Sequence, residues 1–424
     1  MFRKLIIILC LAFPEILPLT GVGATMLAEP DSIRVTLLTC SPGPEVYSLY
    51  GHTALRVQVP DDSLDVVFNY GVFDMSKPFF AWHFVLGQTD YMVMSIPWQY
   101  FPKDYEMRGS SITEQELNLT RAEASRLLGN LIENCLPENR RYRYNFLYGN
   151  CTTKVRDMVE QVVVGSIQYP DSLPQQTARE ILHQYTAGHP WAQDGNDLLL
   201  GAEVDTVMSE RAAMFIPYNM MQAFDGAFIR NAKGDMRPLV RSRKVILEAN
   251  PAAPQAGGDA GASPSLLDSL AGRFSPLQAT FAFGGLCLFI MLLEVCFKSR
   301  FWLWDVLLLL LQGLAGTLLA FMFLFSEHPA VDSNWQVWLL NPMYLVGIPF
   351  VIKSATRSKT NAWFSVYFSV LALFLLFCPW IPQVFAKITV PLALCLLTRP
   401  VSYYLVKDKK GKGERLRKAK RNKR

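Results

Sequence analysis

Hydrophobic positions along this 424-residue chain follow two different patterns. Before residue 250 they alternate with polar positions or recur at helical spacing, which is typical of a folded domain with strands and helices. After residue 273 they form long apolar runs, each close to the ~20 residues that cross a bilayer. These runs predict five membrane spans within residues 273–406, near 277–297, 302–325, 335–352, 361–381 and 385–406.

The first region mixes strand-like and helix-like segments. Residues 52–59 alternate between apolar and polar side chains, and residues 66–70 predict the next strand. A capping box at 120–123 predicts the start of one helix. Residues 151–164 have apolar side chains at helical spacing, with Asn150 in the N-cap position. We therefore expect an α+β domain over residues 25–248.

Three further segments complete the expected organisation. Residues 1–24 combine a basic start, a short apolar run and small residues, which predicts a signal peptide. Residues 249–272 are rich in Pro, Ala and Gly and are expected to form a linker. The tail, residues 407–424, contains 11 Lys and Arg against 2 Asp and Glu. A basic tail that directly follows a span is typical of a topology signal that touches anionic lipid. We therefore expect no nucleic-acid partner.

The positive charges of the short loops predict the orientation. Lys298 and Arg300 lie between the first two spans, and Lys353 follows the third, whereas residues 326–334 contain no Lys or Arg. Positive charges mark the cytoplasmic side of a membrane protein. The N-terminal domain is thus expected on the periplasmic side of a bacterial inner membrane, and the C-terminus in the cytoplasm.

Cys151 and His52 are the first candidates for chemistry. A helix N-terminus stabilises a thiolate, and a histidine from a strand can take its proton. Without Cys10 of the signal peptide, the exported domain keeps only Cys40, Cys135 and Cys151, so one thiol stays free even if Cys40 and Cys135 pair. From the residues alone, a buried or disulfide-bonded Cys151 remains an alternative to a catalytic one.

A catalytic imidazole also needs a group that orients it. Asn69, on the strand after His52, is our first candidate and Asn150 the second. The backbone amides of Cys151 and Thr152, at a helix start, could form part of an oxyanion hole. The five histidines are scattered without ligand spacing, so we expect neither a metal site nor a cofactor.

Polar residues in and near the spans are candidates for lipid contact. His328 and Asn334 lie in the loop on the expected outer side, where they could bind a lipid headgroup or simply form a polar loop. Arg399 and Glu294 lie within spans, where charges are costly. Headgroup contact by Arg399, snorkelling, and pairing with Glu294 are the alternatives.

Four motifs resemble those of one family. They are TCSPG at 39–43, YGHTALR at 50–56, NYGVFD at 69–74 and YNFLYGNCTT at 144–153. Followed by terminal spans, they resemble the Lnb-type lipoprotein N-acyltransferases of certain Gram-negative bacteria. The order of histidine before cysteine is also similar to circularly permuted NlpC/P60-like and LRAT-like thiol enzymes.

The resemblance implies a circularly permuted papain-like periplasmic domain, with Cys151 as nucleophile and His52 as base. Tyr50, Asn150 and Thr152 become candidates for positioning or oxyanion binding. The implied reaction moves an acyl chain from a membrane phospholipid, through a Cys151 thioester, to the N-terminal amine of a diacylated lipoprotein. No cofactor is required. The alternatives are a membrane-tethered cysteine hydrolase of cell-wall peptide or lipid esters, and a non-catalytic lipid or lipoprotein binding module.

Overall fold

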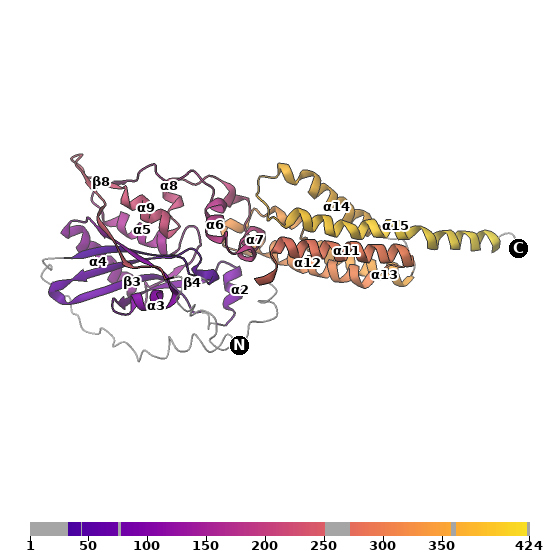
Figure 1. Ribbon diagram of the computed structural model, residues 1–424, viewed down its shortest axis with the longest axis horizontal. Coiled ribbons are helices and arrows are strands. Elements are labelled where there is room, and N and C mark those ends of the chain that lie inside the picture. Colours follow the sequence, from indigo (N-terminus) through magenta and orange to yellow (C-terminus); the bar gives the residue numbers. More distant parts are fainter. Residues whose placement is uncertain (1–32, 44, 75–77, 251–271, 358–361, 422–424) are drawn as a thin grey trace. The chain divides into compact units, whose positions relative to one another are not determined.

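The computed structural model describes five stretches of the chain (Figure 1), and the expected signal peptide and nearly all of the expected linker lie outside them. The chain forms two compact units. The first unit contains the chain up to Tyr185 and Val207–Ser263, and the second contains Thr186–Thr206 and Pro264–Arg424. The described stretches are 33–43, 45–74, 78–250, 272–357 and 362–421.

The first unit is built on a seven-stranded antiparallel sheet. The strand order is β10-β5-β1-β2-β3-β4-β6, so β1, β2 and β3 lie in its middle. The strand predicted from the alternation at residues 52–59 is β2, in which Ala54, Leu55 and Val57 are buried. The strands are β1 (Arg34–Cys40), β2 (His52–Val59), β3 (Leu64–Val72), β4 (Asp90–Pro97), β5 (Ile112–Leu117), β6 (Arg141–Arg143) and β10 (Val240–Leu247).

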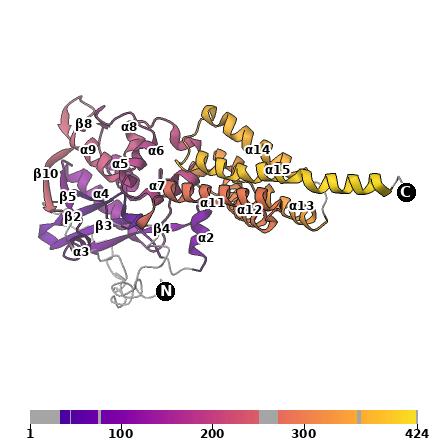
Figure 2. The ribbon, with the colours of Figure 1, turned by 45° about the vertical axis from the view of Figure 1, so that its right-hand side comes forward.

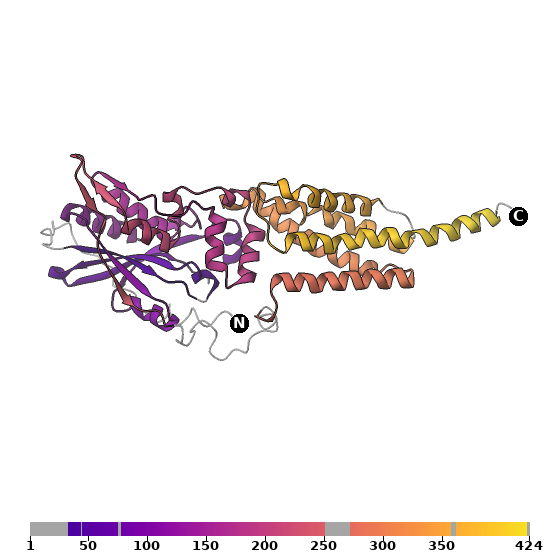
Figure 3. The ribbon, with the colours of Figure 1, turned by 45° about the horizontal axis from the view of Figure 1, so that its top comes forward.

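Helices cover both faces of this sheet. Helix α5 packs against β2, β3 and α4 on one face, where α9 also contacts β1 (Figures 1 and 3). On the other face, Phe101 of α3 joins a buried cluster with Leu38, Ala54 and Val67. The mixture of sheet and helices confirms the expected α+β character. The helices are α2 (Phe80–Val85), α3 (Phe101–Arg108), α4 (Arg121–Cys135), α5 (Cys151–Val162), α6 (Ala178–Thr186), α8 (Glu210–Ala213) and α9 (Pro217–Asp225).

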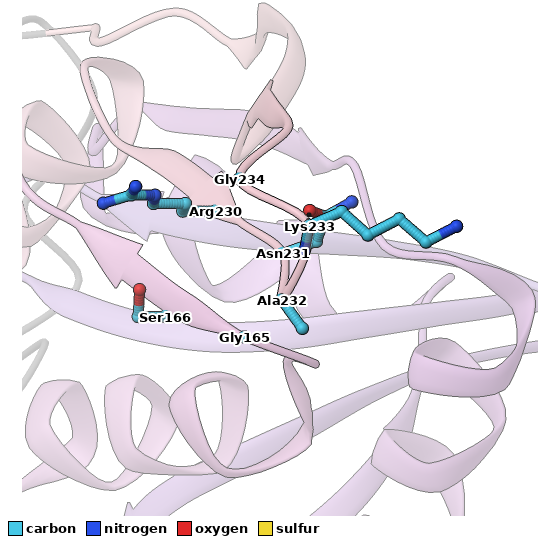
Figure 4. Close-up of a pocket in the computed structure, with 7 residues that line it drawn as sticks. All are labelled: Gly165, Ser166, Arg230, Asn231, Ala232, Lys233 and Gly234. Carbon is cyan, nitrogen blue, oxygen red and sulfur yellow. Dashed lines mark hydrogen bonds between the residues drawn. The ribbon is translucent and has the colours of Figure 1, made fainter.

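A small second sheet completes the first unit. Its strands are β7 (Ser166–Gln168), β8 (Phe228–Arg230) and β9 (Met236–Pro238), in the order β7-β8-β9. Figure 4 shows the shallow hollow where Gly165 and Ser166 face the turn that joins β8 to β9. None of the residues that line it belongs to the elements that contain Cys151, His52 or Asn69. The hollow therefore belongs to other elements, and to the other sheet, than the candidate residues Cys151, His52 and Asn69.

The second unit contains five segments that are long and apolar enough to cross a membrane, as expected. The third span differs from the expected continuous run at 335–352. A 3₁₀ turn, η5, occupies Trp335–Trp338, and α13 begins only at Met343, after Asn341-Pro342. The helices of these spans are α11 (Pro276–Phe297), α12 (Trp302–Phe325), α13 (Met343–Arg357), α14 (Trp363–Phe377) and α15 (Thr389–Arg421).

Two glycines of α12 explain how the irregular start of the third span is accommodated. A Cβ atom at Gly316 would lie 2.5 Å from backbone atoms of Leu340 and Asn341. At Gly313 it would lie 2.5 Å from the Leu345 side chain. Small residues allow such close approach between membrane helices. The non-helical turn therefore rests directly on the α12 backbone.

Residues 186–206 lie within the expected range of the N-terminal domain, but they pack with the second unit. They form α7 (Pro190–Leu199) and the 3₁₀ turn η3 (Ala202–Asp205), with α7 beside α11 (Figure 2). The Asn334 amide donates to Leu198 O (2.8 Å), and the Gln336 amide donates to Asp197 O (2.6 Å). Buried side chains from the loop before α13 therefore hold this segment in place.

Candidate active site

Cys151 is the first residue of α5, and Asn150 fixes this helix start. The Asn150 Oδ1 atom accepts hydrogen bonds from the backbone N–H groups of Thr152 and Thr153, both at 2.9 Å. In return, the Thr153 hydroxyl accepts from the Asn150 N–H at 2.9 Å. This reciprocal cap satisfies donors that a helix start otherwise leaves unpaired. It leaves the Cys151 N–H without an acceptor inside the helix.

His52 begins β2 after a glycine that the backbone requires. Gly51 has a φ of +77°, and a Cβ atom there would lie 2.6 Å from Cys40 O. Only glycine adopts such a conformation readily, so the turn before His52 depends on it. His52 then pairs with Cys40 across β1 and β2. The imidazole is thereby attached to the centre of the sheet.

Asn69 of β3 orients the imidazole. Its Oδ1 atom lies 2.6 Å from His52 Nε2, so Nε2–H donates to the amide oxygen. The remaining nitrogen, Nδ1, is then available to the thiol. A hydrogen bond between the Cys151 and His52 side chains is part of this arrangement. The structure thus brings together the three residues that the sequence selected.

The environment of Cys151 favours the thiolate. Burial raises the pKa of the thiol, but the His52 charge and a hydrogen bond from His52 lower it further, together with the Thr53 N–H and the Thr152 hydroxyl, to about 7. For His52, burial lowers the pKa, yet the Cys151 thiolate and the hydrogen bonds with Cys151 and Asn69 raise it overall. The two shifts favour an ion pair of thiolate and imidazolium.

Asn150 and Thr152 do not supply the expected oxyanion donors. The Thr152 N–H is engaged by Asn150 Oδ1. The Asn150 amide donates to Phe146 O and Phe215 O, both at 2.8 Å. These contacts suit positioning, one of the two roles considered for Asn150 and Thr152, better than oxyanion binding. The Thr152 hydroxyl, 3.8 Å from the Cys151 Sγ atom, lies close enough to stabilise the thiolate.

Tyr50 lies one residue before the glycine turn, and its ring packs against two other aromatic rings. Its ring meets Phe146 edge-on at 5.1 Å and Tyr185 at 6.1 Å. These contacts join the turn before β2 to the loop before α5 and to α6. The positioning role expected for Tyr50 is consistent with this packing and stays a prediction.

Two residues near the thiol were not identified from the sequence. A Cβ atom at Gly71, which has a φ of +95°, would lie 3.5 Å from the Cys151 Cβ atom and 4.0 Å from His52 Cε1. The Tyr142 hydroxyl is buried beside the Gly71 backbone and has no acceptor among the described residues. Gly71 stands in one of the motifs, so a signal existed. Tyr142, between two arginines on a short strand, had none.

Cys40 and Cys135 are both free thiols, so the possible disulfide between them is not formed. Burial raises the pKa of Cys40 well above its usual range, and burial raises that of Cys135 to about 11. Cys40 is fully buried and is hydrogen bonded to Tyr105. Both thiols are therefore protonated at neutral pH, in contrast to Cys151.

Two of the three headgroup candidates form contacts inside the second unit. Asn334 is buried and donates to Leu198 O and Leu199 O. Arg399 is buried and forms ion pairs with Asp305 (2.7 Å) and Glu294 (2.8 Å). For Arg399, pairing with Glu294 is thus the alternative that the structure shows, and headgroup contact by Asn334 or Arg399 stays a prediction. His328 is half-buried before the turn η4 (Pro329–Val331), and its role stays a prediction.

No group of three or more His, Cys, Asp and Glu side chains able to hold a metal occurs in the described ranges. The site therefore consists of a thiolate, an imidazole, an amide that orients it, and the amides and hydroxyls around them. Such a set can perform nucleophilic attack on a carbonyl carbon, followed by proton transfer to the leaving group.

Comparison with known proteins gives two matches to family models. The model described as the Lnb N-terminal periplasmic domain matches residues 24–184, and the model described as the Lnb transmembrane domain matches residues 268–411. No curated protein and no solved structure matches. The first match contains Cys151, His52 and Asn69, and it ends within α6, where the chain passes to the second unit. The two matches together cover most of the sequence.

Proposed function

This chain belongs to the Lnb family, and we propose that it is a membrane-bound lipoprotein N-acyltransferase that uses Cys151 as its nucleophile. Membership supports a membrane enzyme that modifies lipoproteins. The observation that carries the finer proposal is the Cys151–His52–Asn69 arrangement, in which the thiol pKa is lowered to about 7. A thiolate at neutral pH suits transfer of an acyl group, because it attacks esters and leaves readily as a thiolate.

In the first half-reaction, the Cys151 thiolate attacks the carbonyl carbon of a phospholipid ester. The C–S bond forms, and the ester C–O bond breaks when the tetrahedral intermediate collapses. The His52 imidazolium gives its proton to the departing alkoxide, which leaves as a lyso-phospholipid. The Asn69 amide, 2.6 Å from His52 Nε2, keeps Nδ1 directed at the reacting atoms.

In the second half-reaction, the neutral α-amine of a diacylated lipoprotein attacks the thioester. The C–N bond forms and the C–S bond breaks, which restores the Cys151 thiolate. His52 takes the proton that the amine loses, so the imidazolium is also restored. The products are an N-acylated lipoprotein and the starting enzyme, and no metal or soluble cofactor enters the balance.

Negative charge develops on the carbonyl oxygen in both steps, and two donors near the thiol are suited to stabilise it. The Cys151 N–H has no acceptor within α5 because it is the first residue of the helix. The Tyr142 hydroxyl has no acceptor among the residues described. We propose these two groups as the oxyanion hole, in place of the Thr152 N–H.

The packing of the site also supports a permuted papain-like core. Helix α5, which begins at the cysteine, packs against β2 and β3, which contain the histidine and asparagine. The histidine strand precedes the cysteine helix in the sequence, as the resemblance implies. We further propose that the first unit lies in the periplasm of a bacterial inner membrane and that the basic tail is cytoplasmic, because Lys and Arg gather in alternate loops.

The proposal is tested by replacing Cys151 in the full-length protein. In cells that depend on this protein, Cys151→Ser should leave lipoproteins diacylated, as seen by mass spectrometry of their N-terminal peptides. Cys135→Ser, which alters a protonated thiol elsewhere in the first unit, is the matched control and should retain N-acylation. Full N-acylation by Cys151→Ser would refute the mechanism. Intact N-acylation together with loss of peptidoglycan or lipid-ester cleavage would instead identify a cysteine hydrolase.

A further inference from the structure

Aromatic rings lead from the neighbourhood of the thiol to an exposed helix. Tyr144 stacks on Tyr91 (4.0 Å between ring centroids), Tyr91 on Phe73 (4.9 Å), Phe73 on Phe80 (5.9 Å) and Phe80 on Phe84 (6.3 Å). We call these five rings the aromatic row. Its ring Phe73 lies two residues after Gly71, where a Cβ atom would lie 3.5 Å from the Cys151 Cβ atom. The Cys151 charge also adds to burial in raising the pKa values of Tyr91 and Tyr144.

The outer end of the aromatic row lies on α2 and is open to solvent. Phe84 is 44% exposed, Trp82 49% and Phe79 78%. Large aromatic side chains gathered on one short helix are costly to leave in water and often mark a binding surface. The row therefore offers a continuous apolar path between the thiol and the surface of the first unit.

Arg108, on α3, provides a positive charge on the side of the site away from the aromatic row. It is the last residue of α3, is half-buried, and forms no ion pair with any residue that the structure describes. Just after it, the Ser110 hydroxyl donates to Pro42 O, and the backbones of Ser41 and Ser111 are joined by a hydrogen bond. Residues 40–42 in turn adjoin the Gly51 turn. Arg108 thus belongs to the rim around His52.

Tyr47 connects the charge to the aromatic row. Its ring meets Phe73 edge-on at 6.5 Å, and it is 59% exposed. Burial raises the pKa of Tyr47, whereas the nearby Arg108 charge lowers it. The Arg108 charge also opposes the overall rise in the pKa of His52. The aromatic row and the Arg108 guanidinium, which lies over the Tyr105 ring at 6.0 Å from its centroid, therefore approach the site from two sides.

We propose that this surface is the binding site of the acyl donor, a glycerophospholipid. One acyl chain lies along the aromatic row, the phosphate pairs with Arg108, and the ester between them reaches Cys151. Arginine is well suited to phosphate because its planar fork donates two parallel hydrogen bonds. The inference rests on the proposed function and adds the class of lipid and the residues that select it. A neutral ester would use the aromatic row but gain nothing from Arg108.

Binding can be measured without chemistry by using the full-length Cys151→Ala protein in dodecyl maltoside micelles. Dioleoyl phosphatidylglycerol or dioleoylglycerol is titrated, and bound lipid is counted by native mass spectrometry. Arg108→Gln should weaken retention of phosphatidylglycerol by about tenfold, the loss expected for one charge-assisted hydrogen-bonded pair. It should leave dioleoylglycerol unchanged. Lys103→Gln, which removes an exposed cation from the same helix, is the matched control and should change neither.

Phe84→Ser tests the aromatic row in the same assay. It should weaken retention of dioleoyl phosphatidylglycerol but not of the dihexanoyl form, whose chains are too short to reach the outer end. Phe228→Ser removes a ring of matching exposure (43%) from β8 and should have no effect. Equal losses for charged and neutral lipids in Arg108→Gln, or no loss in either variant, would overturn the proposed site.

Acyl loading separates the failure of this inference from failure of the proposed function. The protein with Cys151 intact is incubated with the same lipids, and the mass added to the Cys151 peptide is followed. Selective binding through Arg108 without any acylation would refute the acyltransferase but keep the lipid site. Acylation at the same rate in the parent, Arg108→Gln and Phe84→Ser proteins would keep the enzyme and refute the site.

Discussion

Replacing His52 with alanine should move the titration of Cys151 by a large and measurable amount. Burial raises the pKa of this thiol, and the interactions with His52 are the strongest that lower it. In His52→Ala the burial remains while these interactions disappear. The Thr53 N–H and the Thr152 hydroxyl stay in place but act more weakly. The thiol of the variant should therefore titrate at or above the ordinary value for cysteine.

The size of this shift follows from the lowered pKa of about 7. An unperturbed cysteine has a pKa of about 8.5, so the site stabilises the thiolate by at least about 1.5 pKa units, or about 2 kcal/mol. At pH 7 about half of the Cys151 thiols are then ionised, against about 3% for an unperturbed thiol. A site that stabilises the thiolate by this amount keeps a nucleophile ready at neutral pH.

The assay is alkylation of Cys151 by iodoacetamide between pH 5 and 10, with the modified peptide quantified by mass spectrometry. The midpoint is more informative than the rate at one pH, because a thiolate of higher pKa is also a stronger nucleophile. We expect a midpoint near 7 that moves to about 8.5 or above in His52→Ala. His189→Ala, at an exposed histidine of the second unit, should leave it unchanged. A midpoint that stays within half a unit in His52→Ala would refute the ion pair.

Three further predictions concern the remaining parts of the site and the membrane unit. Asn69→Ala should slow acyl loading of the thiol by tenfold to about a hundredfold, because a hydrogen bond to a charged imidazole is worth about 1.5–3 kcal/mol; an unchanged rate would argue against the orienting role. Tyr142→Phe should slow loading by about a hundredfold without moving the alkylation midpoint, and a moved midpoint would assign the hydroxyl to the thiolate instead. Arg399→Leu leaves Glu294 and Asp305 buried without their cation. It should lower the free energy of unfolding of the second unit by roughly 3–5 kcal/mol, seen as a reduced Tm in detergent, and an unchanged Tm would contradict this.

The sequence predicted the local structure around Cys151 where side-chain type and local order decide it. An asparagine before a cysteine and a run of apolar positions at helical spacing are sufficient to place Cys151 at a helix start. Asn69 was selected because it lies on the strand after His52, and the structure places its Oδ1 atom 2.6 Å from His52 Nε2; its catalytic role stays a prediction. Both features depend on the repeat of side-chain direction, every two residues in a strand and every 3.6 residues in a helix. This repeat can be recognised in a single sequence.

Features set by tertiary packing were not predictable in the same way. The buried Tyr142 hydroxyl depends on how β6 pairs with β4. Asn334 reads as a loop residue in the sequence, yet it is buried because residues 186–206 pack on it. That long-range contact joins positions more than a hundred residues apart, and no local pattern records it.

The placement of residues 186–206 has a consequence for the modularity of this protein. The chain leaves the first unit after Tyr185, contributes α7 and η3 to the second, and returns at Val207, so three covalent crossings connect the units. Cutting the chain at residue 250 would release a fragment that still contains α7 and η3 but has lost the Asn334 and Gln336 amides, which donate to the Leu198 and Asp197 carbonyls. The two units are therefore not interchangeable parts joined by one tether. A version of the first unit without the membrane spans would have to replace this excursion with a direct connection between Tyr185 and Val207.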